Sequence, residues 1–123
     1  MLDSPLMSRE TQRKGDIGLT KAIARFTEMG FDVSLPITES GAYDMIVDDG
    51  SGLHRVQCKY SSRAKAEVNL RKHYTNTKSG YTTQHYIEGS YDWLYVYHPA
   101  YGEFLFKSCI TGTTKCLSKE NKL

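Results

Sequence analysis

Apolar residues recur every three to four positions near the start of the chain, which predicts a helix over residues 8–29. The apolar stripe consists of Leu19, Ala22, Ile23, Phe26 and Met29. Gly30 is a suitable stop for this helix. Because Gly15 and Gly18 weaken its first half, we expect the regular part of the helix to begin near residue 16.

Segments rich in β-branched and aromatic residues predict strands in the rest of the chain. They span residues 31–35, 43–47, 53–60, 67–70, 93–97 and 103–107. Short turns follow 43–47 and 93–97, so each of these segments is expected to form a hairpin with the next strand. Residues 71–90 have no clean period and are predicted to form a long loop or irregular segment, and the tail from residue 111 is predicted to be frayed or partly helical. A helix followed by mostly hairpin-connected strands predicts an α+β fold with a mixed sheet.

Length and composition predict a single domain over residues 1–123, with residues 1–12 flexible and 111–123 a polar tail. No apolar run approaches the roughly 20 residues that a membrane-spanning helix needs, and the start of the sequence lacks the pattern of a secretory signal. Three cysteines without a close pair are typical of a reduced protein, so we expect an intracellular, cytoplasmic location and no membrane partner. A zinc site built from Cys109, Cys116 and a histidine would lack the closely spaced ligand pairs usual for zinc.

The net charge is only +2, so composition alone does not predict nucleic-acid binding. The basic residues nevertheless gather in three clusters: Arg9, Arg13 and Lys14; Lys59, Arg63, Lys65, Arg71, Lys72 and His73; and Lys115, Lys119 and Lys122. Each cluster alone is typical of a solvated surface. A basic surface around an acidic pocket also attracts a polyanion while the pocket holds a cation, which is what a nuclease requires.

The segment 43–60 carries the residues with the clearest chemistry. Gln57 and Lys59 share one face of its second strand, and Asp44 lies near the start of its first strand. The Asp44 carboxylate, the Gln57 side-chain carbonyl and the Cys58 backbone carbonyl are oxygen ligands that suit Mg²⁺. Lys59 would activate the attacking water or stabilise charge on a phosphate. The alternatives are that Asp44 belongs to a turn and that Gln57 and Lys59 form an exposed polar face.

Three phrases of the sequence resemble the PD-(D/E)XK nuclease superfamily: Arg13-Lys-Gly-Asp16, Tyr43-Asp-Met-Ile-Val47 and Arg55-Val-Gln-Cys-Lys-Tyr60. They are most similar to the small group I intron homing endonuclease branch, which has Gln in place of the usual acid. The motif is short, so its specificity depends on the helix before it and the strands after it. The resemblance implies a restriction-endonuclease-like, α/β/α-like fold with a mixed β-sheet core and flanking helices. It also implies a DNA endonuclease that hydrolyses phosphodiester bonds with Mg²⁺ or Mn²⁺.

The sequence departs from the superfamily pattern at two positions. Gln57 stands where an acid is usual, which removes a negative charge and predicts weaker metal binding. Relatives commonly have a Glu on the helix where this chain has Leu19, and Asp16 lies one turn earlier on the same stripe. Asp16 is therefore expected to complete the site, the alternative being a helix cap; Glu39 is a further candidate ligand unless it is only a solvated loop acid. The predicted catalytic residues are Asp16, Asp44, Gln57 and Lys59, and the predicted metal ligands are Asp16, Asp44, Gln57 and Cys58.

Basic residues around this site are predicted to contact double-stranded DNA, and they are Arg13, Lys14, Arg63, Lys65, Arg71, Lys72 and Lys78. Tyr74, Tyr81 and Tyr86 are candidates for contact with the bases, the alternatives for this segment being an oligomer interface or disorder. One domain of this size cannot contact a long DNA site alone, so a site-specific homing enzyme is expected to be a homodimer or homotetramer. The alternative functions are a Holliday-junction resolvase-like nuclease and a nuclease-like DNA-binding module that has lost catalysis.

Overall fold

The computed structural model describes residues 9–39, 41–76, 80–84 and 86–123, with residues 72–76 and 80–84 described by their backbone. The helical elements are α2 (Glu10–Glu28) and the 3₁₀ helix η1 (Lys119–Asn121). The strands are β1 (Asp32–Ser34), β2 (Met45–Asp48), β3 (Leu53–Tyr60), β4 (Glu67–Asn69), β5 (Lys72–Asn76), β6 (Gly80–Gln84), β7 (Trp93–His98), β8 (Gly102–Phe106) and β9 (Thr114–Cys116). The two predicted hairpins are confirmed as the pairs β2–β3 and β7–β8.

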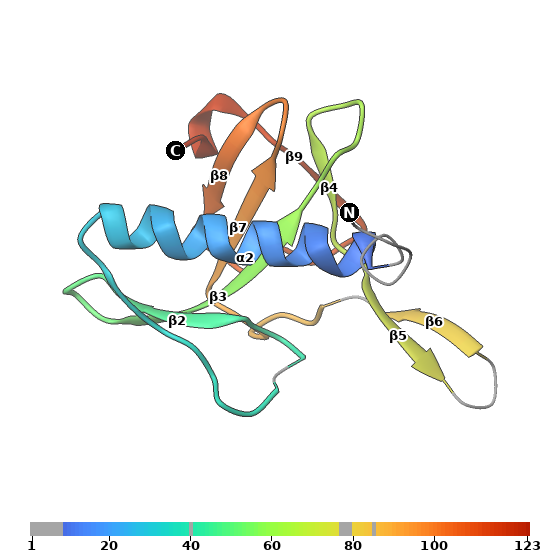
Figure 1. Ribbon diagram of the computed structural model, residues 1–123, viewed down its shortest axis with the longest axis horizontal. Coiled ribbons are helices and arrows are strands. Elements are labelled where there is room, and N and C mark those ends of the chain that lie inside the picture. The colour runs from blue at the N-terminus through green and yellow to red at the C-terminus, as the bar shows by residue number, and fades with distance from the viewer. Residues whose placement is uncertain (1–8, 40, 77–79, 85) are drawn as a thin grey trace, which may run out of the picture.

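A mixed five-stranded sheet forms the centre of the molecule, with the strand order β1-β2-β3-β7-β8. β3 and β7 are parallel, and the other neighbours are antiparallel. β3 is therefore the middle strand, hydrogen-bonded to β2 on one side and to β7 on the other. This arrangement confirms the predicted α+β, restriction-endonuclease-like sheet. In the described part of the chain, α2 is the α-helix that flanks it (Figure 1).

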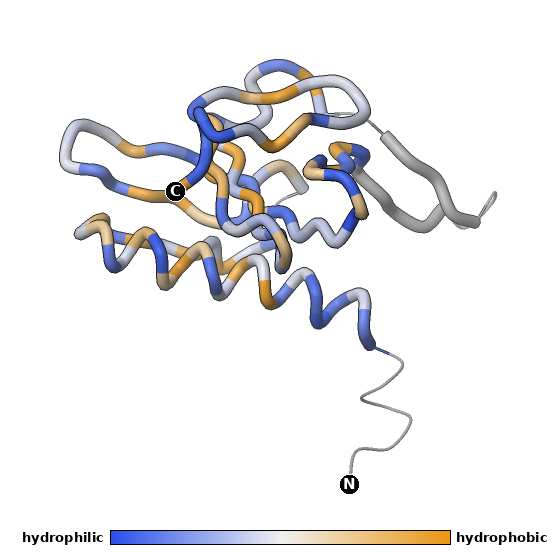
Figure 2. Tube along the Cα trace, turned by 90° about the horizontal axis from the view of Figure 1, so that it is seen from above, coloured by the Kyte–Doolittle hydropathy of each residue, from blue (hydrophilic) through white to orange (hydrophobic). Residues whose placement is uncertain are grey.

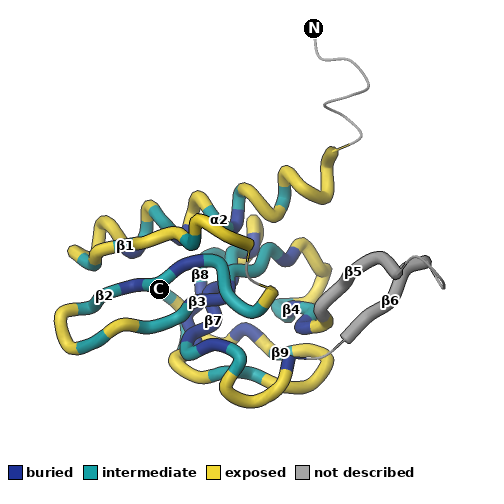
Figure 3. Tube along the Cα trace, turned by 90° about the horizontal axis from the view of Figure 1, so that it is seen from below, coloured by how far each residue is buried: buried dark blue, intermediate teal, exposed yellow. Residues whose placement is uncertain are grey.

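One face of the sheet is covered by α2, which lies across β3 and β7 (Figure 1). Gly18, Ala22 and Phe26 recur every four residues and are buried, whereas the outer side of the helix is exposed (Figure 3). Their partners in this core include Met45, Val47, Val56, Trp93, Tyr95 and Leu105. No helix among the described residues is long and apolar enough to cross a membrane.

The helix begins at Glu10 rather than near residue 16, and its first turns are hydrophilic (Figure 2). Gly15 has open space around it and only lowers the helix propensity. Gly18 has a packing role, because a Cβ at this position would lie 3.3 Å from the carbonyl oxygen of Lys59. The close approach of α2 to β3 thus offsets the low helix propensity that predicted a later start.

The opposite face of the sheet packs against a second core. Its buried residues are Leu94 and Val96 of β7, Phe104 and Phe106 of β8, and Val68, Leu70, Tyr86, Tyr91 and Leu117. The antiparallel pair β4–β9 supplies part of this layer. The tail that was predicted to be frayed or partly helical therefore contributes a strand and η1, because the buried Leu117 ties it to the core.

Residues 71–90 contain a hairpin, so the predicted long loop is wrong for this segment. β5 and β6 are paired from Lys72 opposite Gln84 to Asn76 opposite Gly80. Within the described residues they pair with no other strand, and Figure 1 shows them extending away from the central sheet and α2. Thr and Tyr favour strands here, but the segment lacks the apolar alternation by which a half-buried strand is recognised.

Candidate active site

The β2–β3 hairpin brings three polar groups together just before β2. Asp44 Oδ2 accepts hydrogen bonds from the backbone N–H of Cys58 at 2.9 Å and from Nε2 of Gln57 at 3.0 Å. The same Gln57 nitrogen lies 3.3 Å from the carbonyl oxygen of Cys58. Gln57 is buried and Asp44 is partly buried. Three of the four predicted metal ligands therefore meet at one point.

The register of the β2–β3 hairpin brings Asp44 beside Gln57 and Cys58. The backbone N–H of Asp44 donates to the carbonyl of Val56 over 2.8 Å, one position beyond the regular pairing of β2 and β3. At the turn, the Asp49 carboxylate accepts hydrogen bonds from backbone N–H groups, and Gly50 has a φ of 89°, which glycine adopts without strain. A slip of one residue would exchange the two faces of β3, so this turn keeps Gln57 beside Asp44.

The donor set fits a hard divalent cation. Two acceptor oxygens, Asp44 Oδ2 and the Cys58 carbonyl, converge on one donor nitrogen, as they would on a cation. The two ends of an amide group have nearly the same shape, so a turned Gln57 amide would present Oε1 as a third oxygen. Oxygen ligands of this kind suit Mg²⁺, which also keeps several waters. The charge of the set is low, because the described residues contain no group of three or more His, Cys, Asp or Glu side chains placed to hold a metal.

Lys59 lies on the same face of β3 as Gln57. Its Nζ is 3.4 Å from the carbonyl oxygen of Arg71 and 5.2 Å from the centroid of the Tyr86 ring. Burial lowers the pKa of Lys59, and the charge of Asp44 opposes part of this shift. Burial likewise raises the pKa of Asp44, against the hydrogen bond from Cys58 and the charge of Lys59. Burial thus disfavours the charged forms of both groups, which is common among catalytic residues.

Cys58 and Tyr86 have supporting positions beside these groups. The Cys58 side chain packs on the α2 side of β3, where burial, with a contribution from the charge of Asp44, raises the pKa of its thiol. Its candidate ligand is therefore the backbone carbonyl. The predicted contact of Tyr86 with DNA is wrong, because its side chain is only 6% exposed and packs edge-on against Tyr91. Its place beside Lys59 had no signal in the sequence, since residues 71–90 show no apolar period.

The chain matches the profile of the PD-(D/E)XK endonuclease family over residues 9–109, a range that includes α2, the central sheet and all the groups described above. The chain belongs to the PD-(D/E)XK endonuclease family. Among solved structures it is similar to that of a bacterial homing endonuclease, I-Ssp6803I, with a TM-score of 0.70 and 25% sequence identity, covering 89% of this chain and 79% of that chain. No match is found among curated proteins.

These similarities confirm the resemblance drawn from the three sequence phrases, including the homing endonuclease branch. They support nuclease activity for the chain. PD-(D/E)XK nucleases generally use divalent metal ions, which agrees with the oxygen-rich donor set around Asp44.

Asp16 lies away from Asp44, Gln57 and Lys59 in this member of the PD-(D/E)XK endonuclease family. It precedes Gly18 by two positions on α2, and Gly18 faces β3, so Asp16 lies on the exposed side of the helix. It lines a cavity of about 140 Å³ together with Arg9, Gln12 and Arg13. Gln57 and Lys59 lie on the sheet face opposite α2, because their neighbours on β3 alternate into the helix-side core. The structure thus brings Asp44, Gln57, Cys58 and Lys59 together, but not Asp16.

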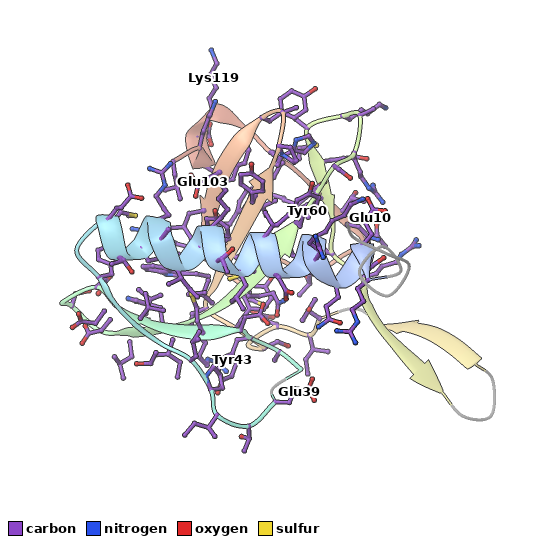
Figure 4. The ribbon with its side chains drawn as sticks, viewed as in Figure 1. Glu10, Glu39, Tyr43, Tyr60, Glu103 and Lys119 are labelled. Carbon is purple, nitrogen blue, oxygen red and sulfur yellow. The ribbon has the colours of Figure 1, made fainter. Side chains whose placement is uncertain are left out.

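Glu39 shares a cavity with Asp44. This cavity has a volume of about 160 Å³ and is lined by Pro36, Thr38, Glu39, Tyr43 and Asp44. Figure 4 shows Glu39 and Tyr43 on the connection between β1 and β2. Glu39 is exposed. It is a better candidate than Asp16 for an additional ligand beside Asp44, because Asp16 lines a different cavity.

The predicted DNA-contacting residues occupy varied positions. Arg13, Arg63, Lys65 and Arg71 are exposed. Arg63 is engaged by Glu67 at 2.8 Å, and Lys14 lies 4.0 Å from Glu10. Lys72 begins β5, where the backbone alone is described, and Lys78 lies outside the described residues.

Proposed function

We propose that this protein is a Mg²⁺-dependent endonuclease, active also with Mn²⁺, that hydrolyses phosphodiester bonds of double-stranded DNA as a site-specific, homing-type enzyme. The observation that carries the proposal is the convergence of the Asp44 carboxylate, the Gln57 amide and the Cys58 carbonyl beside a partly buried Lys59. Membership of the endonuclease family and the similarity to a bacterial homing endonuclease support the substrate and the type of enzyme.

The residues of the site have separate parts in this reaction. Asp44, the turned Gln57 amide and the Cys58 carbonyl would hold the divalent ion, which when bound neutralises phosphate charge and acidifies a water. Lys59, whose pKa is lowered by burial, holds its proton less tightly than an exposed lysine and can exchange it with the attacking water. In its ammonium form the same group stabilises the negative charge that develops on the phosphate.

We further propose that the enzyme acts as a homodimer or homotetramer. Specific protein–DNA interfaces of one small module are limited in area, so a long recognition site requires several copies. Closed symmetry would give two active sites, which cleavage of both strands requires. Sedimentation of the free protein and of its complex with DNA would measure the number of copies.

The test compares supercoiled plasmid, linear duplex and a four-way junction, each with Mg²⁺ or with EDTA. Wild-type protein is expected to cut duplex DNA with Mg²⁺ and to lose cutting in EDTA, in Asp44→Asn and in Lys59→Ala. The matched controls are Asp32→Asn and Lys119→Ala, which remove the same charges elsewhere on the molecule. Equal loss in the controls would show that general charge, not this site, supports cleavage.

A second candidate, a DNA-binding module without catalysis, is favoured by one observation: the described residues contain no group of three or more His, Cys, Asp or Glu side chains placed to hold a metal, and Asp16 does not join Asp44. Binding of DNA without cutting in any metal, by wild type and both site variants alike, would establish that alternative. Preferential cutting of the four-way junction would instead indicate a resolvase-like nuclease.

A further inference from the structure

The β5–β6 hairpin leaves the molecule directly beside Lys59. Arg71 immediately precedes β5, and its carbonyl oxygen lies 3.4 Å from Lys59 Nζ. Tyr86 follows β6 by two residues, and its buried ring lies 5.2 Å from the same nitrogen. Both ends of the hairpin are therefore fixed at the catalytic lysine, while its two strands extend away from the body (Figure 1).

The charge of this segment is one-sided. Residues 68–87 contain no Asp or Glu, whereas they include Arg71, Lys72 and Lys78. The chain as a whole is nearly balanced, with 16 basic and 14 acidic residues, so this acid-free stretch is a local departure. An acid-free basic segment is complementary to a polyanion and has no carboxylate to repel a phosphate backbone.

The composition of the two strands suits contact with base edges. The register pairs Lys72 with Gln84, Tyr74 with Thr82 and Asn76 with Gly80, and alternation assigns these residues to one face of the ribbon. Asn and Gln are the side chains whose amides pair with both N6 and N7 of adenine in the major groove. Asn76 and Gln84 are thus placed at opposite ends of one face.

The size of the hairpin also suits the major groove of DNA. The major groove of B-DNA, about 12 Å wide, admits a two-stranded β-ribbon. Five residues of strand span about 17 Å, which is the rise of about five base pairs at 3.4 Å each. An isolated hairpin is only marginally stable in water, so a partner that receives this ribbon would also stabilise it.

We propose that the β5–β6 ribbon enters the major groove of the DNA substrate, contacts base edges through Asn76 and Gln84, and thereby sets which phosphate lies at Lys59. The proposal rests on the proposed function, because it takes duplex DNA as the substrate. One ribbon contacts about five base pairs, so each protomer supplies one short segment of sequence preference.

The test is a binding experiment in the Asp44→Asn background, so it does not depend on cleavage. Duplexes with a randomised centre are selected on this protein, and the selected pool is treated with dimethyl sulfate. Methylation at guanine N7 or at adenine N3 then reports contact in the major or the minor groove, respectively. We expect N7 methylation to exclude duplexes from the complex and N3 methylation to have little effect.

Variants of the ribbon test which of its residues contact the DNA. Asn76→Ala and Gln84→Ala are each expected to lower the preference for the selected sequence about ten-fold, with little change in affinity for random duplex. Lys72→Ala is expected to weaken binding to both pools and to reduce its salt dependence. Gln12→Ala, which removes an exposed amide on α2, is the matched control and should change neither, and circular dichroism checks that each variant is folded.

The outcomes separate the two proposals. Sequence preference with N7 interference in a protein that never cuts DNA would support the ribbon and overturn the nuclease. Cutting by wild type with interference only at adenine N3, or with preference unchanged in both amide variants, would overturn the ribbon and leave the nuclease. Absence of any duplex binding would overturn the ribbon directly.

Discussion

The two faces of β3 use burial in opposite ways. Val56 and Cys58 pack toward α2, where removal of apolar surface from water stabilises the fold by about 25 cal/mol per Å². Gln57 and Lys59 lie on the other face, where burial opposes ionisation of both Lys59 and the neighbouring Asp44. Adjacent residues of β3 therefore have opposite effects: Val56 and Cys58 stabilise the fold, whereas Lys59 is held where its charged form is disfavoured. The apolar packing under α2 stabilises the fold and offsets the unfavourable burial of ionisable groups on the polar face.

The largest effect should come from removing charge on the polar face. Asp44→Asn is expected to slow metal-dependent cleavage by about 10²–10³-fold or more, because the proposed metal site loses the Asp44 carboxylate. The melting temperature should stay equal or rise, since a buried charge is removed and an oxygen acceptor remains. Single-turnover plasmid cleavage and thermal unfolding measure the two effects, with Asp32→Asn as control. A parallel fall in activity and melting temperature would mean that Asp44 mainly supports the fold.

Substitutions in the helix-side core should instead lower stability and leave activity unchanged. Phe26 is fully buried between α2 and the sheet, so Phe26→Ala is expected to lower the free energy of unfolding by about 3–5 kcal/mol. Cleavage per folded molecule should be retained at low temperature. Urea unfolding measures the loss, and Met29→Ala, at the C-cap of α2 where the side chain is 41% exposed, should change the free energy of unfolding by less than about 0.5 kcal/mol. Similar values for both variants would contradict the assigned core.

Gly18 joins the two faces, because it touches the backbone of β3 directly behind Lys59. Gly18→Ala should gain about 1 kcal/mol of helix propensity but force a shift at the Lys59 carbonyl, 3.3 Å from the new methyl group. We expect cleavage to fall several-fold, with almost no net change in stability.

The matched control for that variant is Gly15→Ala, in the same helix but with open space around it. It should stabilise the protein by about 0.5–1 kcal/mol and leave cleavage unchanged. If both alanine variants stabilise equally and cut normally, the contact between α2 and β3 does not position Lys59 for the proposed reaction.

The smallest expected effect is on the pH dependence of stability, through two aspartates at opposite ends of the β2–β3 hairpin. The pKa of Asp44 is raised by burial, so its contribution to stability falls as the pH rises above its ordinary value of 3.8. Hydrogen bonds, first from the Ser51 hydroxyl and then from the backbone, lower the pKa of Asp49 to about 2. Its contribution is therefore present above pH 3.8 and is lost as the pH falls toward 2.

Denaturant unfolding of Asp44→Asn and Asp49→Asn across this pH range tests the two signs. Relative to wild type, Asp49→Asn should be less stable at neutral pH and converge with it in acid. Asp44→Asn should show its advantage at neutral pH and lose it in acid. The same direction of change in both variants would contradict the opposite shifts.

The sequence was sufficient for the parts of the molecule in which local pattern and tertiary packing agree. Residues 43–60 and 93–107 alternate around tight turns, and both became hairpins of the central sheet. The same alternation placed Gln57 and Lys59 on one face, so the link between Asp44, Gln57 and Cys58 followed from period and register. The parallel pairing of β3 with β7 had no local signal, because it joins segments far apart in the chain.

The errors have physical causes at particular residues. Gly18 was judged by helix propensity, but the close approach of β3 makes glycine the residue that fits there. Asp16 was expected to follow the stripe of Leu19, but the helix turns its small residues to the sheet and leaves Asp16 outside. Residues 71–90 were expected to be a loop because a hairpin that projects from the body has no apolar face to reveal its period.

Because β5 and β6 are tied to the rest of the chain at Arg71 and Tyr86, and pair with no other strand in the described structure, no strand pairing of the central sheet depends on their sequence. Mutations there can accumulate, or the whole ribbon can be replaced by one of another composition, without repacking the sheet. The composition of such a segment can therefore change while the residues that build the central sheet and α2 stay the same.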